Sequence, residues 1–174
     1  MSQASERPVS AGGAKLFKVA FDLDVDASGW PPVSVERLWG EKTDVRSEIR
    51  VVNTPFFVSG IAYGDLVQVR PDHERRELVY DHFTEESGHS TVRVVFMRDE
   101  ARGAVEQRLT ESGCDWETPR QFENLMAVDV PPDVDYATLR RWLLERVDGG
   151  GIEIQESALS QVHRTQIRPP GAAG

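Results

Sequence analysis

Three polar residues at alternate positions of one expected β-strand are the strongest candidates for chemistry in this chain. His89, Thr91 and Arg93 follow a turn at Gly88, and side chains two apart on a strand share one face. Histidine accepts or donates a proton near neutral pH, and a guanidinium group holds carboxylates or phosphates. The row therefore predicts either an anion site with a proton-transfer group or a set of structural polar contacts.

Polar residues on neighbouring strands would complete this candidate site. Because those strands run antiparallel to the strand that carries His89, we expect Asp129 and Ser157 to gather beside His89 at one end of the sheet. The candidate ligand-binding residues are Thr91, Arg93, Glu153, Gln155 and Ser157. In the structural interpretation, Arg93 instead forms a static ion pair with Asp129 or Glu153, because a buried arginine needs a carboxylate partner.

Glu36 is a further candidate catalytic acid or base, besides His89, Arg93 and Asp129. It lies in an expected strand over 33–39 whose other face carries Val33, Val35 and Trp39. Between apolar neighbours it could sit in a sheltered site. The alternation of a half-buried strand instead places Glu36 in solvent.

Other reactive residue types lack the surroundings that their chemistry needs. Ser90 and His89 are adjacent on a strand and point to opposite faces, so they predict no serine nucleophile. His73, His82 and His89 are too widely spaced to indicate a metal site, and no motif indicates a cofactor. Cys114 has no basic neighbour in the sequence that would lower its pKa, so we expect an unreactive thiol.

The elements before residue 88 read as short strands separated by turns. Five strands at this spacing are typical of a small, partly open β-barrel, and we expect an SH3-like barrel over residues 15–87. The expected strands cover residues 16–25, 33–39, 48–53, 66–69 and 78–83.

After residue 88 the periodicity changes to an alternation of strands and helices. A strand over 89–97 leads to a helix that Asp99 caps and Gly113 ends. Two strands, at 114–117 and 125–130, precede a helix capped by Asp135, and the last strand covers 152–157. This order predicts a ferredoxin-like βαββαβ fold over residues 88–158, and an α+β chain overall. We expect a disordered segment over 1–14 and a flexible tail over 159–174.

Composition limits the partners of this chain. Of 174 residues, 20 are Lys or Arg and 29 are Asp or Glu, giving a net charge of −9 that makes nucleic acid an unlikely partner. One cysteine, the lack of a signal peptide and the lack of an apolar span of about 20 residues predict a cytoplasmic protein without membrane contact. The sequence leaves the oligomeric state open.

Several motifs resemble, in the same order, those of the bacterial family known as domain of unknown function 4265. The resemblance covers about residues 15–158 and implies one recurring unit, but no reaction, cofactor or catalytic residue. It is carried by Gly29-Trp-Pro-Pro-Val-Ser-Val-Glu-Arg-Leu-Trp39, Asn53-Thr-Pro-Phe-Phe57, Tyr63-Gly-Asp65, Gly88-His-Ser-Thr-Val-Arg93, Gly113-Cys-Asp-Trp116 and Val128-Asp-Val-Pro-Pro-Asp-Val-Asp-Tyr136.

Together these features predict an accessory binding module that recognises a small anionic or peptide ligand, or a protein partner, at the junction of its two halves. Two other classes stay open. One is a small enzyme in which His89 is the general acid or base, Arg93 orients a carboxylate or phosphate, and Asp129 or Glu36 assists. The other is an immunity-type or regulatory inhibitor, whose acidic surface would suit a basic target protein.

Overall fold

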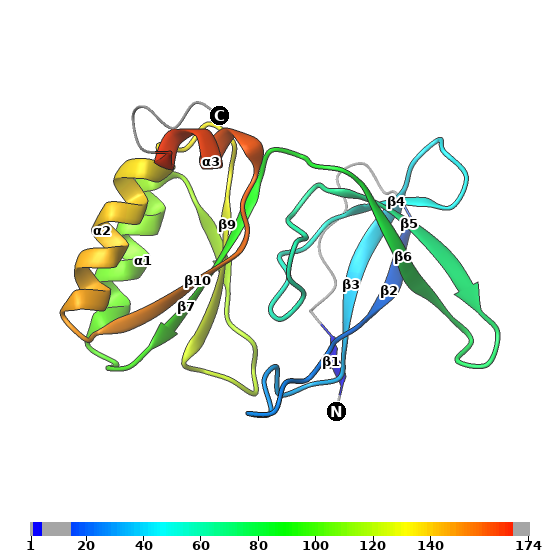
Figure 1. Cartoon of the computed structure of the whole chain (residues 1–174), viewed down its shortest axis with the longest axis horizontal. Coiled ribbons are helices and arrows are strands. Elements are labelled where there is room, and N and C mark those ends of the chain that lie inside the picture. Colours follow the sequence, from blue (N-terminus) through cyan, green and yellow to red (C-terminus); the bar gives the residue numbers. More distant parts are fainter. Residues whose placement is uncertain (1, 5–14, 169–174) are drawn as a thin grey trace. The chain divides into compact units, whose positions relative to one another are not determined.

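The protein is described here as a computed structural model that covers residues 2–4 and 15–168. It is a mixed α+β chain, as expected, and it divides into two compact units, Met1–Ser87 and Gly88–Gly174 (Figure 1). Of the segment 1–14, which we expected to be disordered, only 2–4 lie within the described residues. Residues 169–174 of the expected tail also lie outside them.

The first unit is built from one sheet, in the strand order β1-β3-β2-β6-β5-β4. Because β3 pairs with β4 as well as with β2, the pairings of β2, β3, β4, β5 and β6 form a continuous cycle. Neighbouring strands are antiparallel except for the β1–β3 and β2–β6 pairs. The strands are β1 (Ser2–Ala4), β2 (Leu16–Asp22), β3 (Val35–Lys42), β4 (Glu48–Val51), β5 (Leu66–Asp72) and β6 (Glu77–Glu85).

The faces of β3 are the reverse of those expected from the sequence. Glu36, Leu38 and Gly40 are the buried row, whereas Val35 and Trp39 are only half-buried. Gly40 shows why, since a Cβ atom there would lie 1.9 Å from Cγ2 of Ile49 on β4. The close approach of β3 to β4 requires the glycine on the inner face, and the alternation then brings Glu36 inside.

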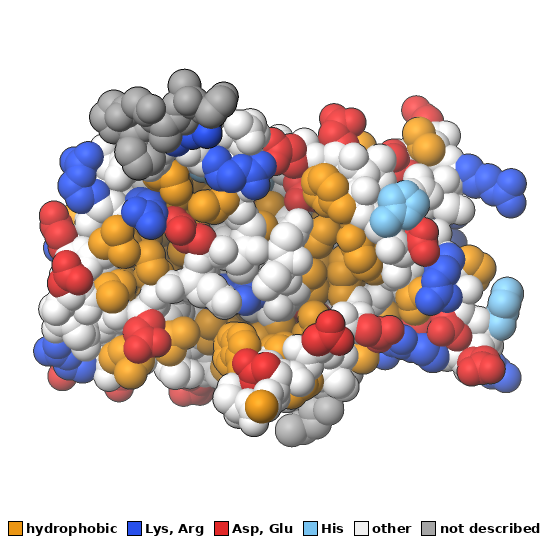
Figure 2. Space-filling model, in the orientation of Figure 1, with side chains coloured by type: hydrophobic (Ala, Val, Ile, Leu, Met, Phe, Trp, Pro, Cys, Tyr) orange, Lys and Arg blue, Asp and Glu red, His pale blue; other side chains and the backbone are white. Residues whose placement is uncertain are grey.

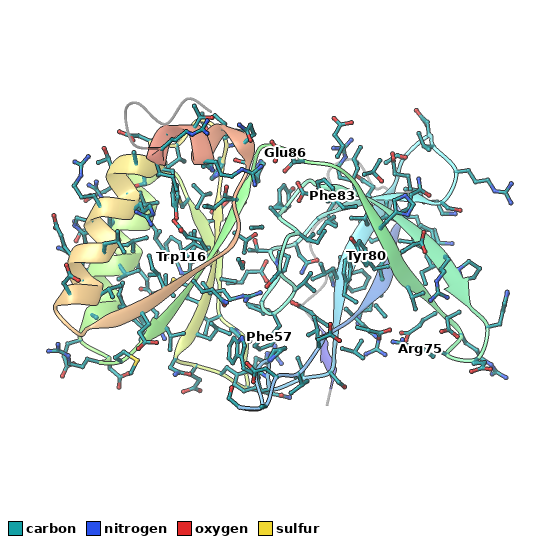
Figure 3. The ribbon with its side chains drawn as sticks, in the orientation of Figure 1. Phe57, Arg75, Tyr80, Phe83, Glu86 and Trp116 are labelled. Carbon is teal, nitrogen blue, oxygen red and sulfur yellow. The ribbon has the colours of Figure 1, made fainter. Side chains whose placement is uncertain are left out.

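The core of the first unit packs aliphatic side chains from β2, β3, β4 and β5, including Val19, Leu38 and Ile49. The parallel β2–β6 seam has only two paired positions. There, Phe21 of β2 stacks on Tyr80 of β6, with ring centroids 4.7 Å apart; Tyr80 is labelled in Figure 3. This stack adds apolar contact where the backbone pairing is short.

The second unit contains an antiparallel sheet in the strand order β10-β7-β9-β8 and three helices. Helices α1 and α2 cover one face of this sheet (Figure 1). Their apolar residues, among them Leu109 and Leu143, pack on Val94 and Met126 of the sheet. The elements are β7 (Ser90–Phe96), α1 (Ala101–Ser112), β8 (Asp115–Glu117), β9 (Leu125–Val130), α2 (Tyr136–Asp148), β10 (Ile152–Ala158) and α3 (Gln161–Ile167).

Of the three helix ends predicted from the sequence, two agree with the structure. Asp135 caps α2 by accepting a hydrogen bond from the Thr138 amide at 3.0 Å, and α2 ends at Gly149. Gly113 ends α1 in the left-handed conformation, with φ of 79°. The expected cap at Asp99 is wrong, because Glu100 holds the N-cap position of α1 and makes no side-chain capping bond.

Helix α3 was not expected, because the segment after residue 158 has no apolar periodicity. Instead, polar side chains fix it. Ser160 caps its first turn, and His163, which is 0% exposed, points into the unit. Gln166 accepts a hydrogen bond from the Tyr136 amide at 2.7 Å and donates one to the carbonyl of Val134 at 3.2 Å.

No helix in the described part of the chain is both long and apolar enough to cross a bilayer. Acidic side chains are spread over the surfaces of both units on the face shown in Figure 2, in agreement with the net charge of −9.

Candidate functional site

Strand β7 is an inner strand of the second sheet, and its side chains divide between two faces as the sequence predicts. Val92, Val94 and Phe96 belong to the core beneath α1 and α2. Because side chains alternate, Thr91 and Arg93 lie on the face opposite α1 and α2, which we call the open face of the second sheet. Both side chains are nevertheless buried, at 0% and 1% exposed.

His89 and Asp129 form an ion pair at one end of this open face. Nδ1 of His89 lies 2.8 Å from Oδ1 of Asp129, and the two side chains are 21% and 9% exposed. Asp129 comes from β9, opposite Thr91 in the register. Gly88, with φ of 93°, makes the turn that brings the histidine to this position.

Burial raises the pKa of the Asp129 carboxyl, and the hydrogen bond from His89 acts in the opposite direction by favouring the charged form. Because one imidazole nitrogen faces the carboxylate, the orientation of the ring is fixed, and Nε2 is directed away from Asp129. This geometry is suited to holding a proton or a hydrogen-bonding ligand at a defined position.

One partner of Arg93 across the sheet is an amide, which was not among the carboxylate partners considered from the sequence. Its Nη1 atom donates to Oε1 of Gln155 at 2.6 Å, in the register that places Gln155 opposite Arg93. Asp129 pairs with His89, and Glu153 lies two residues before Gln155 on β10, opposite Val95.

Ser157 also lies where the antiparallel arrangement predicts. Its hydroxyl donates to the backbone carbonyl of Thr91 at 3.1 Å, beside a bulge in β10. The structure thus brings His89, Asp129, Thr91 and Ser157 together near the start of β7, with Arg93 and Gln155 farther along the same face.

Glu36 has a structural role in the first unit. Its Oε1 atom accepts the Phe56 amide at 2.7 Å, and its Oε2 atom accepts the amides of Phe57 and Val58 at 2.8 Å each. The side chain is 1% exposed. The expectation of a solvated Glu36 is therefore wrong. Both oxygens are used to fix the backbone of the 56–58 segment, which leaves the carboxylate poorly placed to assist a reaction.

A second polar cluster, which sequence reasoning missed, lies on the helix side of β7. Oγ of Ser90 is 2.7 Å from Nδ1 of His163 and accepts the Ser160 amide at 2.9 Å. Burial lowers the pKa of His163, partly opposed by the nearby Pro131 carbonyl. The signal for this cluster was the N-cap pattern of Ser160 three residues before His163.

The Ser90–His163 distance is that of a nucleophile and its base, yet the site does not fit nucleophilic catalysis. Ser90 and His163 are both 0% exposed, so a substrate cannot reach the hydroxyl. The cluster therefore anchors α3 to β7.

Other reactive groups of the described residues are inert or scattered. Burial raises the pKa of Cys114 to about 12, so this thiol is protonated at neutral pH. Within the described residues, no group of three or more His, Cys, Asp or Glu side chains is arranged to hold a metal ion. An open pocket of about 860 Å³ lies between the start of α1 and residues 118–124, and none of the predicted site residues lines it.

Comparisons with known proteins agree with the resemblance seen in the sequence. A hypothetical protein from Neisseria gonorrhoeae has a crystal structure similar to this one, with a TM-score of 0.67 and 18% sequence identity over 87% of this chain and 99% of that chain. At this identity the similarity concerns the fold alone. No curated protein matches the chain. The model of the family called Domain of unknown function (DUF4265) matches residues 36–154, and the chain belongs to this family.

Proposed function

We propose that this protein is a binding module whose second unit recognises an anionic group, a carboxylate or a phosphate, on the open face of the second sheet. The observation that carries the proposal is the His89–Asp129 pair, with Nδ1 and Oδ1 2.8 Å apart at the end of that face. Asp129 holds the ring in one orientation, and His89 is 21% exposed, so a ligand can reach it.

Arg93 supports the proposal because it adds a permanent positive charge to the same face of β7. It lies four residues after His89, a separation of about 13 Å along a strand. Gln155 holds its guanidinium in place through Oε1. Arg93 itself is only 1% exposed, so the partly exposed His89 is the contact group for a small organic anion or a short peptide, and Arg93 favours the anion through its charge.

The test is a calorimetric titration at pH 7 with inorganic phosphate and, in a separate arm, with acetate. We expect saturable binding of one of these anions, with a Kd on the order of 1 mM for so small a probe. His89→Ala should weaken it at least about tenfold, since a hydrogen bond to a charged group contributes about 1.5–3 kcal/mol. Arg93→Gln, which removes a buried charge without a ligand contact, should weaken it less.

The matched control is His82→Ala, which removes an exposed histidine that is also paired with an aspartate, Asp81. We expect this variant to bind as the wild type does. Equal affinity in Arg93→Gln, His89→Ala and the wild type, or the lack of saturable binding in the wild type, would contradict the proposal.

The His89–Asp129 geometry also favours a second candidate, an enzyme that uses His89 as general acid or base. A carboxylate bonded to Nδ1 is the arrangement that orients a catalytic imidazole toward substrate through Nε2. The test is turnover of p-nitrophenyl acetate and p-nitrophenyl phosphate. The enzyme hypothesis predicts a rate above buffer that His89→Ala and Asp129→Asn both abolish. A rate equal to that of buffer contradicts it.

We also propose names for the two folds. The second unit has the helix and strand order β7-α1-β8-β9-α2-β10 and the sheet order β10-β7-β9-β8, which supports a ferredoxin-like fold. The cycle of pairings from β2 to β6 supports a small SH3-like barrel in the first unit.

A further inference from the structure

Helix α3 is attached to the second unit mainly through buried polar contacts. Ser160, His163 and Gln166 each bind another element, through the Ser90 hydroxyl of β7 and the first amide of α2. Its apolar attachment is smaller: Ile167 packs on the core, whereas Val162 is 39% exposed. The stability of this docking therefore depends on hydrogen bonds that one protonation can change.

His163 is at the centre of these contacts. Its Nδ1 atom lies 2.7 Å from Oγ of Ser90 and 3.2 Å from Oγ of Ser160, and its ring centroid is 5.3 Å from that of Tyr136 on α2. The neutral ring accepts a hydroxyl proton at Nδ1. The amide of Ser160 donates to Oγ of Ser90. The Ser90 hydroxyl is also placed to donate to Oγ of Ser160 at 3.2 Å, so that oxygen and Nδ1 of His163 are alternative acceptors of its one proton.

The Pro131 carbonyl favours a positive charge on His163, but it opposes the effect of burial only in part. Tyr136 donates its hydroxyl to Glu156, and Glu156 also accepts from Arg140, so that carboxylate is already neutralised. Asp129 is paired with His89. Within residues 15–168, no carboxylate forms an ion pair with His163. The titratable groups around it are His89 from β7, Tyr136 from α2 and, behind these, Asp129, Arg140, Glu156 and Cys114.

We propose that α3 is an acid-released latch, in which protonation of His163 detaches α3 from β7 and α2. A buried imidazolium without a carboxylate partner is costly, whereas the same group is fully hydrated once α3 has undocked. Release uncovers Ser90 and the first turn of α2, beside the strand that carries His89. This inference does not depend on the proposed anion site, since it concerns the opposite side of β7.

The direction of the pH dependence follows from burial. Burial lowers the pKa of His163 below its ordinary value of 6.5 in the docked state. The undocked state then binds more protons between that lowered value and 6.5, so docking weakens as the pH falls through this interval. Each unit of lowering corresponds to about a tenfold change in the docking equilibrium.

The experiment is amide hydrogen exchange of α3 in the full chain at pH 7.5 and pH 5.0, corrected for the intrinsic rates. In the wild type we expect the protection of the α3 amides to fall at least about tenfold at the lower pH. One such amide is that of Arg164, which donates to the Ser160 carbonyl. Protection in β9 should change much less. An unchanged α3 at pH 5.0 would overturn the proposal without any variant.

Two non-titrating variants test the assignment to His163. His163→Asn keeps an acceptor near the position of Nδ1, and His163→Phe keeps a ring beside Tyr136. We expect α3 in either variant to have the same protection at both pH values. His82→Asn, at an exposed site, should respond as the wild type does. A tenfold loss at pH 5.0 in both His163 variants, or its absence in His82→Asn, would assign the response to another group and overturn the latch.

Discussion

His89 and Asp129 are 40 residues apart in the sequence. Nδ1 of His89 lies 2.8 Å from Oδ1 of Asp129 at the end of the open face of the second sheet. The contact joins a partly exposed imidazole to a carboxyl group that burial makes harder to ionise. A pair of this kind holds the imidazole in one orientation, which suits it to binding a ligand or transferring a proton.

The first prediction concerns the pH dependence that Asp129 confers. Its pKa is raised in the folded state, so the folded protein binds more protons than the unfolded one between 3.8 and the raised value. Stability from this group is therefore present at low pH and is lost as the pH rises through that interval. Urea unfolding between pH 3.5 and 6.5 should show this loss in the wild type and not in Asp129→Asn. Parallel pH profiles of the two proteins would contradict the assignment.

The second prediction concerns Glu36. Glu36→Gln leaves one acceptor oxygen for three amides and directs an NH₂ group at one of them. We expect a loss of about 3 kcal/mol in the free energy of unfolding, since hydrogen bonds to charged groups contribute about 1.5–3 kcal/mol each. Urea denaturation measures it. Glu41→Gln, on the other face of β3, is the control and should stay within about 0.5 kcal/mol of the wild type. Similar free energies of unfolding for the two variants would contradict the structural role of Glu36.

The third prediction compares two glycines. Gly40→Ala places a Cβ atom against Ile49 and should cost about 1–3 kcal/mol through overpacking. Gly103→Ala meets nothing within 4 Å, inside α1, and should stabilise the protein by about 0.5–1 kcal/mol because alanine has less freedom to lose. Thermal unfolding of both variants provides the measurement. A neutral Gly40→Ala would show that β3 and β4 are not so close.

The fourth prediction concerns the contact of α3 with the start of α2. Gln166→Ala removes one of two acceptors of the Tyr136 amide, the other being the Val134 carbonyl, and should weaken α2 capping by up to about 1 kcal/mol. Hydrogen exchange in the first turn of α2 reports this directly. Thr165→Ala, which removes only a bond to the Gln161 carbonyl within α3, should leave that turn unchanged. If the two variants have the same effect, the Gln166 contact does not support α2.

The sequence is sufficient to predict two kinds of feature: which side chains of a strand share a face, and where a helix begins or ends. The polar and apolar rows of β7 follow from a period of two, and the antiparallel order of its neighbours brings Asp129 and Ser157 beside its start. The caps at Asp135 and Gly113 follow from local backbone chemistry. These inferences need only neighbours in the sequence and one assumed topology.

Other features depend on contacts that the sequence does not reveal. The inner face of β3 is set by the approach of Ile49 to Gly40, and this contact brings Glu36 to the amides of the 56–58 segment. Helix α3 lacks an apolar stripe, so its docking through His163 and Gln166 depends on polar partners 30 to 73 residues away. Local sequence patterns do not reveal such distant pairs. For the same reason, they do not predict the hydrogen bond between Arg93 and Gln155.

The most direct measurement of the central claim is a map of backbone amide shifts by nuclear magnetic resonance during titration of the wild type with inorganic phosphate or acetate. Saturable shifts confined to residues 89–93 and 155–157, and lost in His89→Ala, are the predicted result. Shifts that do not saturate, or that centre on residues outside the open face of the second sheet, would contradict it.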